Sequence, residues 1–94
     1  MQRDKKHYHL FVLEDNDGDY MLIADYLEEQ IANLSLTHVK NFKEAKELFE
    51  KTEAVDIVVM DLSLPDKSGE SLITEALQLF GKCPIIILTG YADL

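Results

Sequence analysis

The stretch VDIVVMD at residues 55–61 is an apolar run that ends in an aspartate, Asp61. The polar, turn-forming residues 62–69 follow it directly. A short apolar run between turn signals is typical of a buried strand, so we predict a strand over residues 55–60 with a carboxylate at its carboxyl end. Open parallel α/β sheets bind ligands outside the carboxyl ends of their strands. The run therefore places Asp61 where such a sheet would hold a ligand.

Two other apolar runs also end in polar residues. We predict a strand over residues 8–14 that ends in Glu14, with Asp15 directly after it, and a strand over residues 85–88 that is followed by Thr89. The last of these runs is apolar throughout, as expected of a strand that is buried on both faces. Three strands therefore deliver carboxylates and a hydroxyl to one edge of the sheet.

Amphipathic stretches alternate with the apolar runs. Alternation of strands and helices predicts an α/β fold with a parallel sheet and helices on both faces, a three-layer α/β/α arrangement. A further short strand is predicted over residues 35–39. Asn41 followed by Glu44 has the pattern of a helix N-terminus. The predicted helices run over residues 17–32, from Asn41 onward, and from Ser68 or Gly69 to a stop at Gly81.

Each predicted helix has one apolar face, which we expect to pack against the sheet. The opposite faces carry acidic residues and are expected to face water. The residues expected to point inward are Tyr20, Ile23, Ala24, Leu27 and Ile31 in the first helix, Phe42, Ala45, Leu48 and Phe49 in the second, and Leu72, Ile73, Ala76, Leu77 and Phe80 in the third.

The composition limits the class of protein. Its 94 residues suffice for one domain, residues 1–94, with residues 1–7 as a frayed lead-in. The formal net charge of −9 argues against binding of nucleic acid, because phosphate backbones require a basic surface. The single cysteine, Cys83, cannot form an internal disulfide, and no signal peptide or long apolar span occurs. We therefore expect a cytoplasmic protein that does not enter a membrane.

The expected sheet order brings acidic groups together. With the strands in the spatial order second, first, third, fourth, the first and third strands are neighbours about 4.8 Å apart. Glu14, Asp15 and Asp61 then lie close to one another. Like charges at that separation raise one another's pKa and destabilise the fold unless a cation lies between them. Mg²⁺ is the expected ion, since it binds one or two carboxylates together with water and phosphate oxygens.

An aspartate beside Mg²⁺ at a strand end can attack phosphorus and form an aspartyl phosphate. We predict that Asp61 is this nucleophile and that Asp15 binds the metal directly. Glu14 would orient a coordinated water or bind the metal at longer reach, and the backbone carbonyl of Ser63 would complete the metal's ligands. Thr89 would donate its hydroxyl to a phosphoryl oxygen. A strand-terminal aspartate alone is more often a turn residue, so the prediction depends on the whole set.

Three segments of the chain carry a shared pattern: VLEDN (residues 12–16), MDLSLP (residues 60–65) with Gly69, and ILTG (residues 87–90). In this order, they resemble one family, the receiver domain of two-component response regulators. The resemblance implies a flavodoxin-like domain that is phosphorylated on Asp61 by a histidine kinase or a phosphotransfer protein. It also implies that Glu14 and Asp15 are the acidic pair and that Thr89 is the switch hydroxyl. Such a domain is a substrate of the kinase and not an enzyme, with weak autophosphatase activity at most.

Part of the receiver pattern is not found in these 94 residues. Receivers carry a fifth strand that ends in a lysine, followed by a last helix, so the resemblance implies a domain truncated after the fourth strand. Loss of that lysine would remove one of the positive charges that hold the phosphoryl group. The alternative is a receiver-like interaction module that binds partners without being phosphorylated. In either case residues 85–88 would form an unpaired apolar edge, through which we predict homodimers or aggregates.

Three other functions fit the sequence less well. The acidic run from Asp15 to Asp19 suggests a calcium loop, but Tyr20 and Tyr26 stand where such a loop requires glycine and glutamate. A haloacid-dehalogenase-type phosphatase carries the pattern Asp-x-Asp, and here Ser63 stands in place of the second acid. A dinucleotide site requires a glycine-rich turn after the first strand, where this chain has acidic residues.

Overall fold

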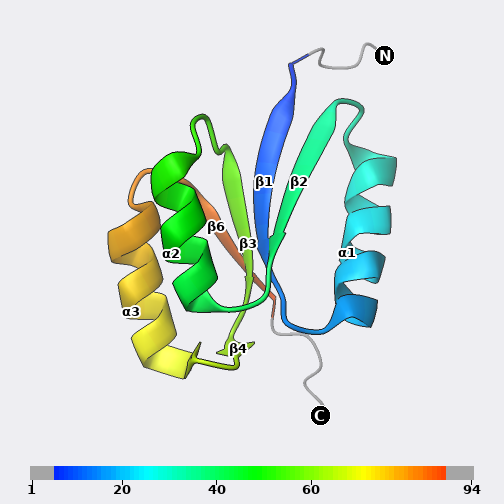
Figure 1. The fold of residues 1–94 in the computed structure, drawn as a ribbon. Coiled ribbons are helices and arrows are strands. Elements are labelled where there is room, and N and C mark those ends of the chain that lie inside the picture. The colour runs from blue at the N-terminus through cyan, green and yellow to red at the C-terminus, as the bar shows by residue number, and fades with distance from the viewer. Residues whose placement is uncertain (1–5, 89–94) are drawn as a thin grey trace.

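A four-stranded parallel sheet forms the centre of the computed structural model, which describes residues 6–88. Helix α1 covers one face of this sheet, and helices α2 and α3 cover the other (Figure 1). The strand order is β2-β1-β3-β6, so the predicted α/β fold, its three layers and its order are confirmed. The strands are β1 (Tyr8–Leu13), β2 (Leu34–Val39), β3 (Ile57–Asp61) and β6 (Ile85–Leu88), and the helices are α1 (Asp17–Gln30), α2 (Phe42–Lys51) and α3 (Gly69–Phe80).

The register of the sheet determines which side chains meet at its carboxyl edge. Leu13 on β1 pairs with Met60 on β3. The next residues along the chain are Glu14, just after β1, and Asp61, the last residue of β3, which therefore lie side by side at this edge. The Glu14 N–H also donates to the Val39 carbonyl of β2 at 3.0 Å. Backbone pairing among three neighbouring strands thus fixes this edge.

Alternate residues along the strands pack on opposite faces of the sheet. The face under α2 and α3 carries the larger core cluster, in which Phe11 and Leu13 are fully buried together with side chains from both helices. The face under α1 carries a smaller cluster around Leu10, Val12 and Val59. Apolar burial, at roughly 25 cal/mol per Å², is the main force that holds such layers together. The carboxyl edge is therefore anchored from both faces.

Three details of the predicted helices are wrong. Helix α1 ends at Gln30, earlier than expected, because Ile31 is already extended (φ −121°, ψ 122°) and its N–H closes the last turn on the Leu27 carbonyl. Leu48 in α2 is 37% exposed and Leu77 in α3 is 60% exposed, although their spacing suggested inward positions. Ala76, the neighbour of Leu77, is buried, and successive helical residues are rotated by roughly 100°, which turns Leu77 away from the core.

Strands β3 and β6 also differ from the prediction. β3 begins at Ile57, later than expected, because its pairing with β1 starts at Leu10, and it includes Asp61 as its last residue. β6 has the predicted bounds, but Ile86 and Ile87 are 49% and 37% exposed, so the strand is not buried on both faces. Within residues 6–88, its only hydrogen-bonded neighbour is β3. The described chain therefore has an apolar strand at one edge of the sheet.

Residues 62–69 are more than the polar turn that was expected. They contain a small antiparallel hairpin of β4 (Ser63–Leu64) and β5 (Lys67–Ser68). Leu64 is buried in the larger core cluster, which draws the hairpin toward the body of the domain. Gly69 follows with a φ of 60°, which glycine adopts without strain, and α3 begins there. Strands of two residues are too short to show an alternation of apolar and polar residues, so the sequence pattern could not predict them.

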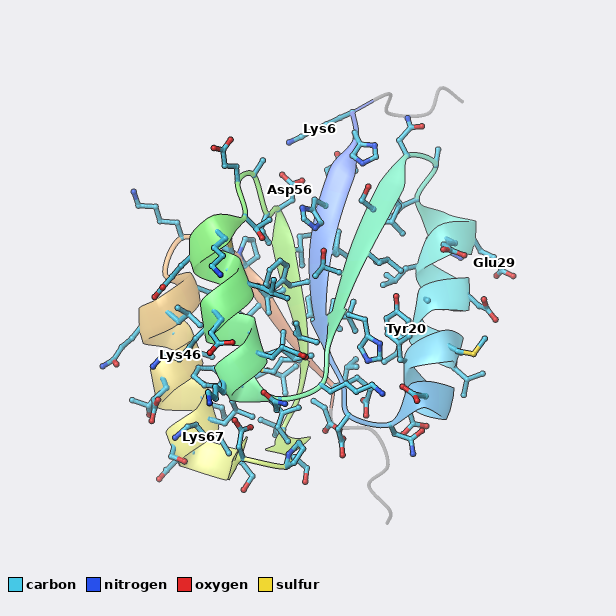
Figure 2. The ribbon with its side chains drawn as sticks, viewed as in Figure 1. Lys6, Tyr20, Glu29, Lys46, Asp56 and Lys67 are labelled. Atoms are coloured by element: carbon cyan, nitrogen blue, oxygen red, sulfur yellow. The ribbon has the colours of Figure 1, made fainter. Side chains whose placement is uncertain are left out.

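Residues 1–5 and 89–94 are not described. Of the lead-in expected over residues 1–7, the structure therefore describes only Lys6 and His7. The Lys6 Nζ lies 3.6 Å from the Asp56 carboxylate (Figure 2), and the His7 Nε2 lies 2.7 Å from the Ser35 Oγ. Thr89, the predicted switch hydroxyl, lies outside the described residues. Among the described helices, none combines the length and the apolar character needed to cross a membrane.

Candidate functional site

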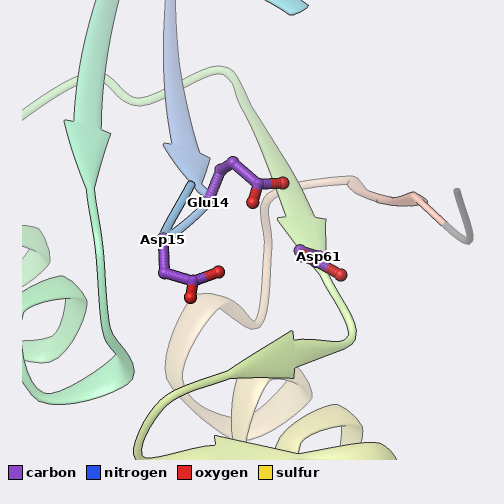
Figure 3. Close-up of side chains that lie close together, drawn as sticks. All are labelled: Glu14, Asp15 and Asp61. Atoms are coloured by element: carbon purple, nitrogen blue, oxygen red, sulfur yellow. The ribbon is translucent and has the colours of Figure 1, made fainter. Parts of the chain in front are cut away.

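Three carboxylates meet at the carboxyl edge of the sheet. Glu14 and Asp15 follow β1, and Asp61 ends β3. One oxygen of each lies within 4.8 Å of an oxygen of the others. Glu14 is buried, Asp61 is half-buried and Asp15 is exposed, and the Glu14 carboxylate points toward Asp61 (Figure 3). The structure therefore confirms the prediction that these strand ends bring the three carboxylates together.

Glu14 is the most unusual of the three residues, because only 4% of its surface is exposed. Burial raises the pKa of its carboxyl to about 7; the hydrogen bond from the Asn16 N–H opposes this rise, and the negative charge of Asp61 adds to it. The carboxyl resists ionisation because it has lost water and faces other anions. A cation bound at this point would favour the ionised form and lower the pKa.

His38 on β2 supports Glu14 in a way that the sequence did not indicate. Its Nε2 lies 2.7 Å from the backbone carbonyl of Glu14 and must donate, because a carbonyl only accepts. The imidazole stacks on the Tyr20 ring of α1, with the ring centroids 3.7 Å apart. The histidines of this chain share no ligand spacing, so no motif marks His38. Alternation along β2, which places His38 on the face under α1, is the signal that could have found it.

Asp61 is held by the chain that follows it. Its Oδ1 accepts the Ser63 N–H at 3.2 Å, which fixes one oxygen of the half-buried carboxylate. Ser63 thus contacts the site through its backbone N–H, which binds Asp61. The Ser63 carbonyl as a metal ligand and Thr89 as a partner of the phosphoryl group stay predictions.

Within residues 6–88, no ion pair neutralises the three carboxylates. The described lysines that form ion pairs do so with Asp56, Asp17 and Glu75. Asp17, in the first turn of α1, is a contrasting case, because the Lys40 Nζ lies 2.9 Å away and lowers the pKa of its carboxyl. The carboxyl edge therefore concentrates negative charge that the described chain does not balance.

Hard divalent cations bind to oxygen ligands of this kind. Mg²⁺ usually takes one or two carboxylates and keeps several waters, whereas Ca²⁺ takes more oxygens at longer distances. Glu14, Asp15 and Asp61 offer carboxylate oxygens only, without the sulfur or imidazole donors that favour transition metals. Burial is the main cause of the raised pKa of Glu14, and the negative charges of Asp61 and Asp15 add to it. The donor set therefore fits a hard divalent ion.

Known proteins are similar to this chain in sequence. The profile of the response regulator receiver domain matches residues 10–94. The response regulator protein PilR of Pseudomonas aeruginosa is 32% identical over 74 residues, which cover 77% of this chain and 16% of PilR. The uncharacterized transcriptional regulatory protein YhcZ of Bacillus subtilis is 44% identical over 50 residues, which cover 53% of this chain and 23% of YhcZ. The matched part is thus less than a quarter of either relative.

A solved structure shares the fold as well. It is the crystal structure of a response regulator protein from Burkholderia pseudomallei with a phosphorylated aspartic acid, a calcium ion and citrate. The two structures align with a TM-score of 0.71 and 30% sequence identity, over 93% of this chain and 49% of that chain. The profile match, the similarity to PilR and the shared fold lead to one conclusion. The chain belongs to the response regulator receiver domain family.

Proposed function

We propose that this chain accepts a phosphoryl group on Asp61 from a histidine kinase or a phosphotransfer protein in a two-component phosphorelay. The observation that carries the proposal is the convergence of Glu14, Asp15 and Asp61 at the carboxyl edge of a receiver fold. A carboxylate held at a strand end is a suitable nucleophile for phosphorus. The phosphorylated aspartic acid in the Burkholderia regulator supports the same chemistry here.

The metal in this proposal is Mg²⁺, bound by Glu14, Asp15, Asp61 and the backbone carbonyl of Ser63. When bound, it would offset the negative charge of the carboxylates and of the phosphoryl oxygens. The calcium ion in the Burkholderia regulator supports a divalent ion at a receiver of this fold. Thr89 would donate its hydroxyl to a phosphoryl oxygen.

The proposed reaction moves a phosphoryl group between two side chains. An oxygen of Asp61 forms a bond to phosphorus, the bond from phosphorus to the imidazole nitrogen of a phosphohistidine breaks, and that nitrogen takes a proton. The product is an acyl phosphate on Asp61. In this reaction the domain is the substrate of its kinase and not an enzyme that acts on other molecules.

The second candidate function is binding of partner proteins without phosphorylation. The exposed apolar residues Ile86 and Ile87 on β6 favour it, because apolar side chains at a sheet edge promote association. Both functions suit a cytoplasmic signalling protein, and the net charge of −9 argues against nucleic-acid binding by this chain in either case. The two differ in whether Asp61 carries a phosphoryl group.

Phosphorylation of Asp61 can be tested with a small phosphodonor. The protein that carries this chain is incubated with phosphoramidate and Mg²⁺, and the modified residue is mapped by mass spectrometry. We expect one acyl phosphate on Asp61, stable in acid and labile in base. Asp61→Asn should prevent the label, whereas Asp56→Asn, just before β3, should keep it. A label on Ser63 or Ser68 would contradict the nucleophile assignment, and no label on any residue would favour the binding module.

A further inference from the structure

The β4–β5 hairpin directly follows Asp61 and is too small to hold its own position. Its two strands are each only two residues long, and a two-residue turn joins them. A hairpin of this size is not stable by itself in water, so its position comes from contacts with the rest of the domain. Burial of Leu64 in the core supplies one contact. Lys67, near the start of α3 (Figure 2), supplies another through its ion pair with Glu75 at 2.8 Å.

Asp66 lies at the tip of the hairpin and makes the third contact. Its Oδ1 accepts the Phe42 N–H at 2.8 Å, and its Oδ2 accepts the Lys43 N–H at 2.9 Å. Desolvation raises the pKa of the Asp66 carboxyl, but the hydrogen bonds outweigh it and leave the pKa below its usual value. The carboxylate therefore caps the N-terminus of α2 from a position 24 residues away along the chain.

Helix α2 also has a local cap of its own. The Asn41 Oδ1 accepts the Glu44 N–H at 2.8 Å, as the sequence predicted. The first N–H groups of a helix lack partners within the helix, and here the local cap and Asp66 satisfy different ones. Of these two caps, only Asp66 connects α2 to the hairpin. The two caps can therefore be separated by mutation.

These contacts run continuously from α2 to the phosphoacceptor. Asp66 ties the hairpin tip to α2, and the first residue of the hairpin, Ser63, donates its N–H to the Asp61 Oδ1 at 3.2 Å. Displacement of the tip would shift the Ser63 backbone against the Asp61 carboxylate. We propose that Asp66 is a positioning residue that holds Ser63 against Asp61 and so supports phosphoryl acceptance. The inference rests on the proposed function of Asp61.

Two alanine variants separate this role from simple stabilisation of α2. Asp66→Ala removes the connection to the hairpin, whereas Asn41→Ala removes the local cap and leaves that connection in place. Each variant removes a cap of the same helix, so we expect similar decreases in Tm. Asp66→Asn keeps one oxygen acceptor and should fall between wild type and Asp66→Ala in every measurement.

Two measurements are made on the folded proteins, well below Tm. The first is the rate of acyl phosphate formation on Asp61 from phosphoramidate at saturating Mg²⁺. We expect Asp66→Ala to be slower by about tenfold and Asn41→Ala to stay within about twofold of wild type. The second is amide hydrogen exchange at Ser63, which should become faster in Asp66→Ala and stay unchanged in Asn41→Ala.

The outcomes distinguish the positioning role from its alternatives. Equal effects of the two alanine variants on rate and exchange would overturn it, because a loosened α2 would then explain both. A decrease in Tm without any change in rate or exchange would overturn it as well, since Asp66 would act only as a cap. If the wild type itself is not phosphorylated, the proposed function fails, and exchange at Ser63 still decides whether Asp66 positions the hairpin.

Discussion

The two ends of the sheet place their carboxylates in opposite surroundings. At the amino end, Asp56 accepts the His9 N–H at 2.9 Å, and the Lys6 Nζ lies 3.6 Å away (Figure 2). The His9 hydrogen bond, helped by the charge of Lys6, lowers the pKa of the Asp56 carboxyl. At the carboxyl end, Glu14 is buried beside Asp61, and burial raises its pKa to about 7.

This difference separates a structural carboxylate from a functional one. The ionised form of Asp56 is matched by a donor and a cation, so it stabilises the fold. The ionised form of Glu14 has a single backbone donor and faces other carboxylates, so it destabilises the fold. Strongly perturbed carboxyl groups that gather at a strand edge are typical of functional sites. The contrast therefore agrees with the phosphoryl chemistry proposed for the carboxyl end, and it assigns the amino end to stability.

Neutralisation of Glu14 and of Asp56, one at a time, should give the largest effect of the tests of this contrast. Without Mg²⁺ at pH 8, Glu14→Gln should raise the free energy of unfolding by up to about 3 kcal/mol, because the pKa of Glu14 is raised from 4.5 to about 7. Asp56→Asn should lower this free energy, because the amide forms a weaker hydrogen bond with the His9 N–H. Denaturant unfolding measures both changes. A change of the same sign in the two variants would remove the contrast.

The pH dependence of stability should show the contrast in the wild type. Glu14 binds more protons in the folded than in the unfolded chain between pH 4.5 and about 7, so stability should fall as pH rises through this window. Asp56 has a lowered pKa, so its contribution is present above pH 3.8 and is lost as pH falls further. Thermal unfolding without Mg²⁺ measures both slopes. If the decline between pH 4.5 and 7 persists in Glu14→Gln, another group causes it.

The lateral edges of the sheet offer a smaller contrast. β2 carries the polar residues Ser35, Thr37 and His38, whereas β6 exposes Ile86 and Ile87. We predict that the 94-residue chain self-associates through β6, because an apolar edge strand pairs readily with a second copy. Sedimentation equilibrium at low micromolar concentration should detect this association, and Ile86→Lys should weaken it. A wild-type monomer at every concentration would rule out the β6 contact.

Strong local patterns predicted most of the fold. The apolar runs that end in Glu14 and Asp61 indicated two strands, and the alternation with helices left few strand orders open. The hairpin at residues 63–68 carries no such pattern, because each of its strands has two residues. The Asp66 cap could not be predicted either, since its partners lie 24 and 23 residues away along the chain.

The features of the candidate site, too, could be predicted only in part from the sequence. Glu14, Asp15 and Asp61 could be found because each stands at the end of an apolar run. Alternation along β2 could have placed His38 on the face under α1, but its stack with Tyr20 and its hydrogen bond to the Glu14 carbonyl depend on packing between different elements. The raised pKa of Glu14 depends on the burial of its side chain, and an acidic residue next to a predicted turn is normally expected to be exposed.

A Mg²⁺ titration tests most directly whether the three carboxylates form a divalent cation site. The free energy of unfolding is measured for wild type, Asp61→Ala and Asp56→Ala as MgCl₂ is added at pH 8. At a Mg²⁺ concentration about ten times the dissociation constant, we expect a gain of about 1.4 kcal/mol for wild type and Asp56→Ala. Asp61→Ala should gain almost nothing. Equal gains in wild type and Asp61→Ala would contradict a cation site at the carboxyl end of the sheet.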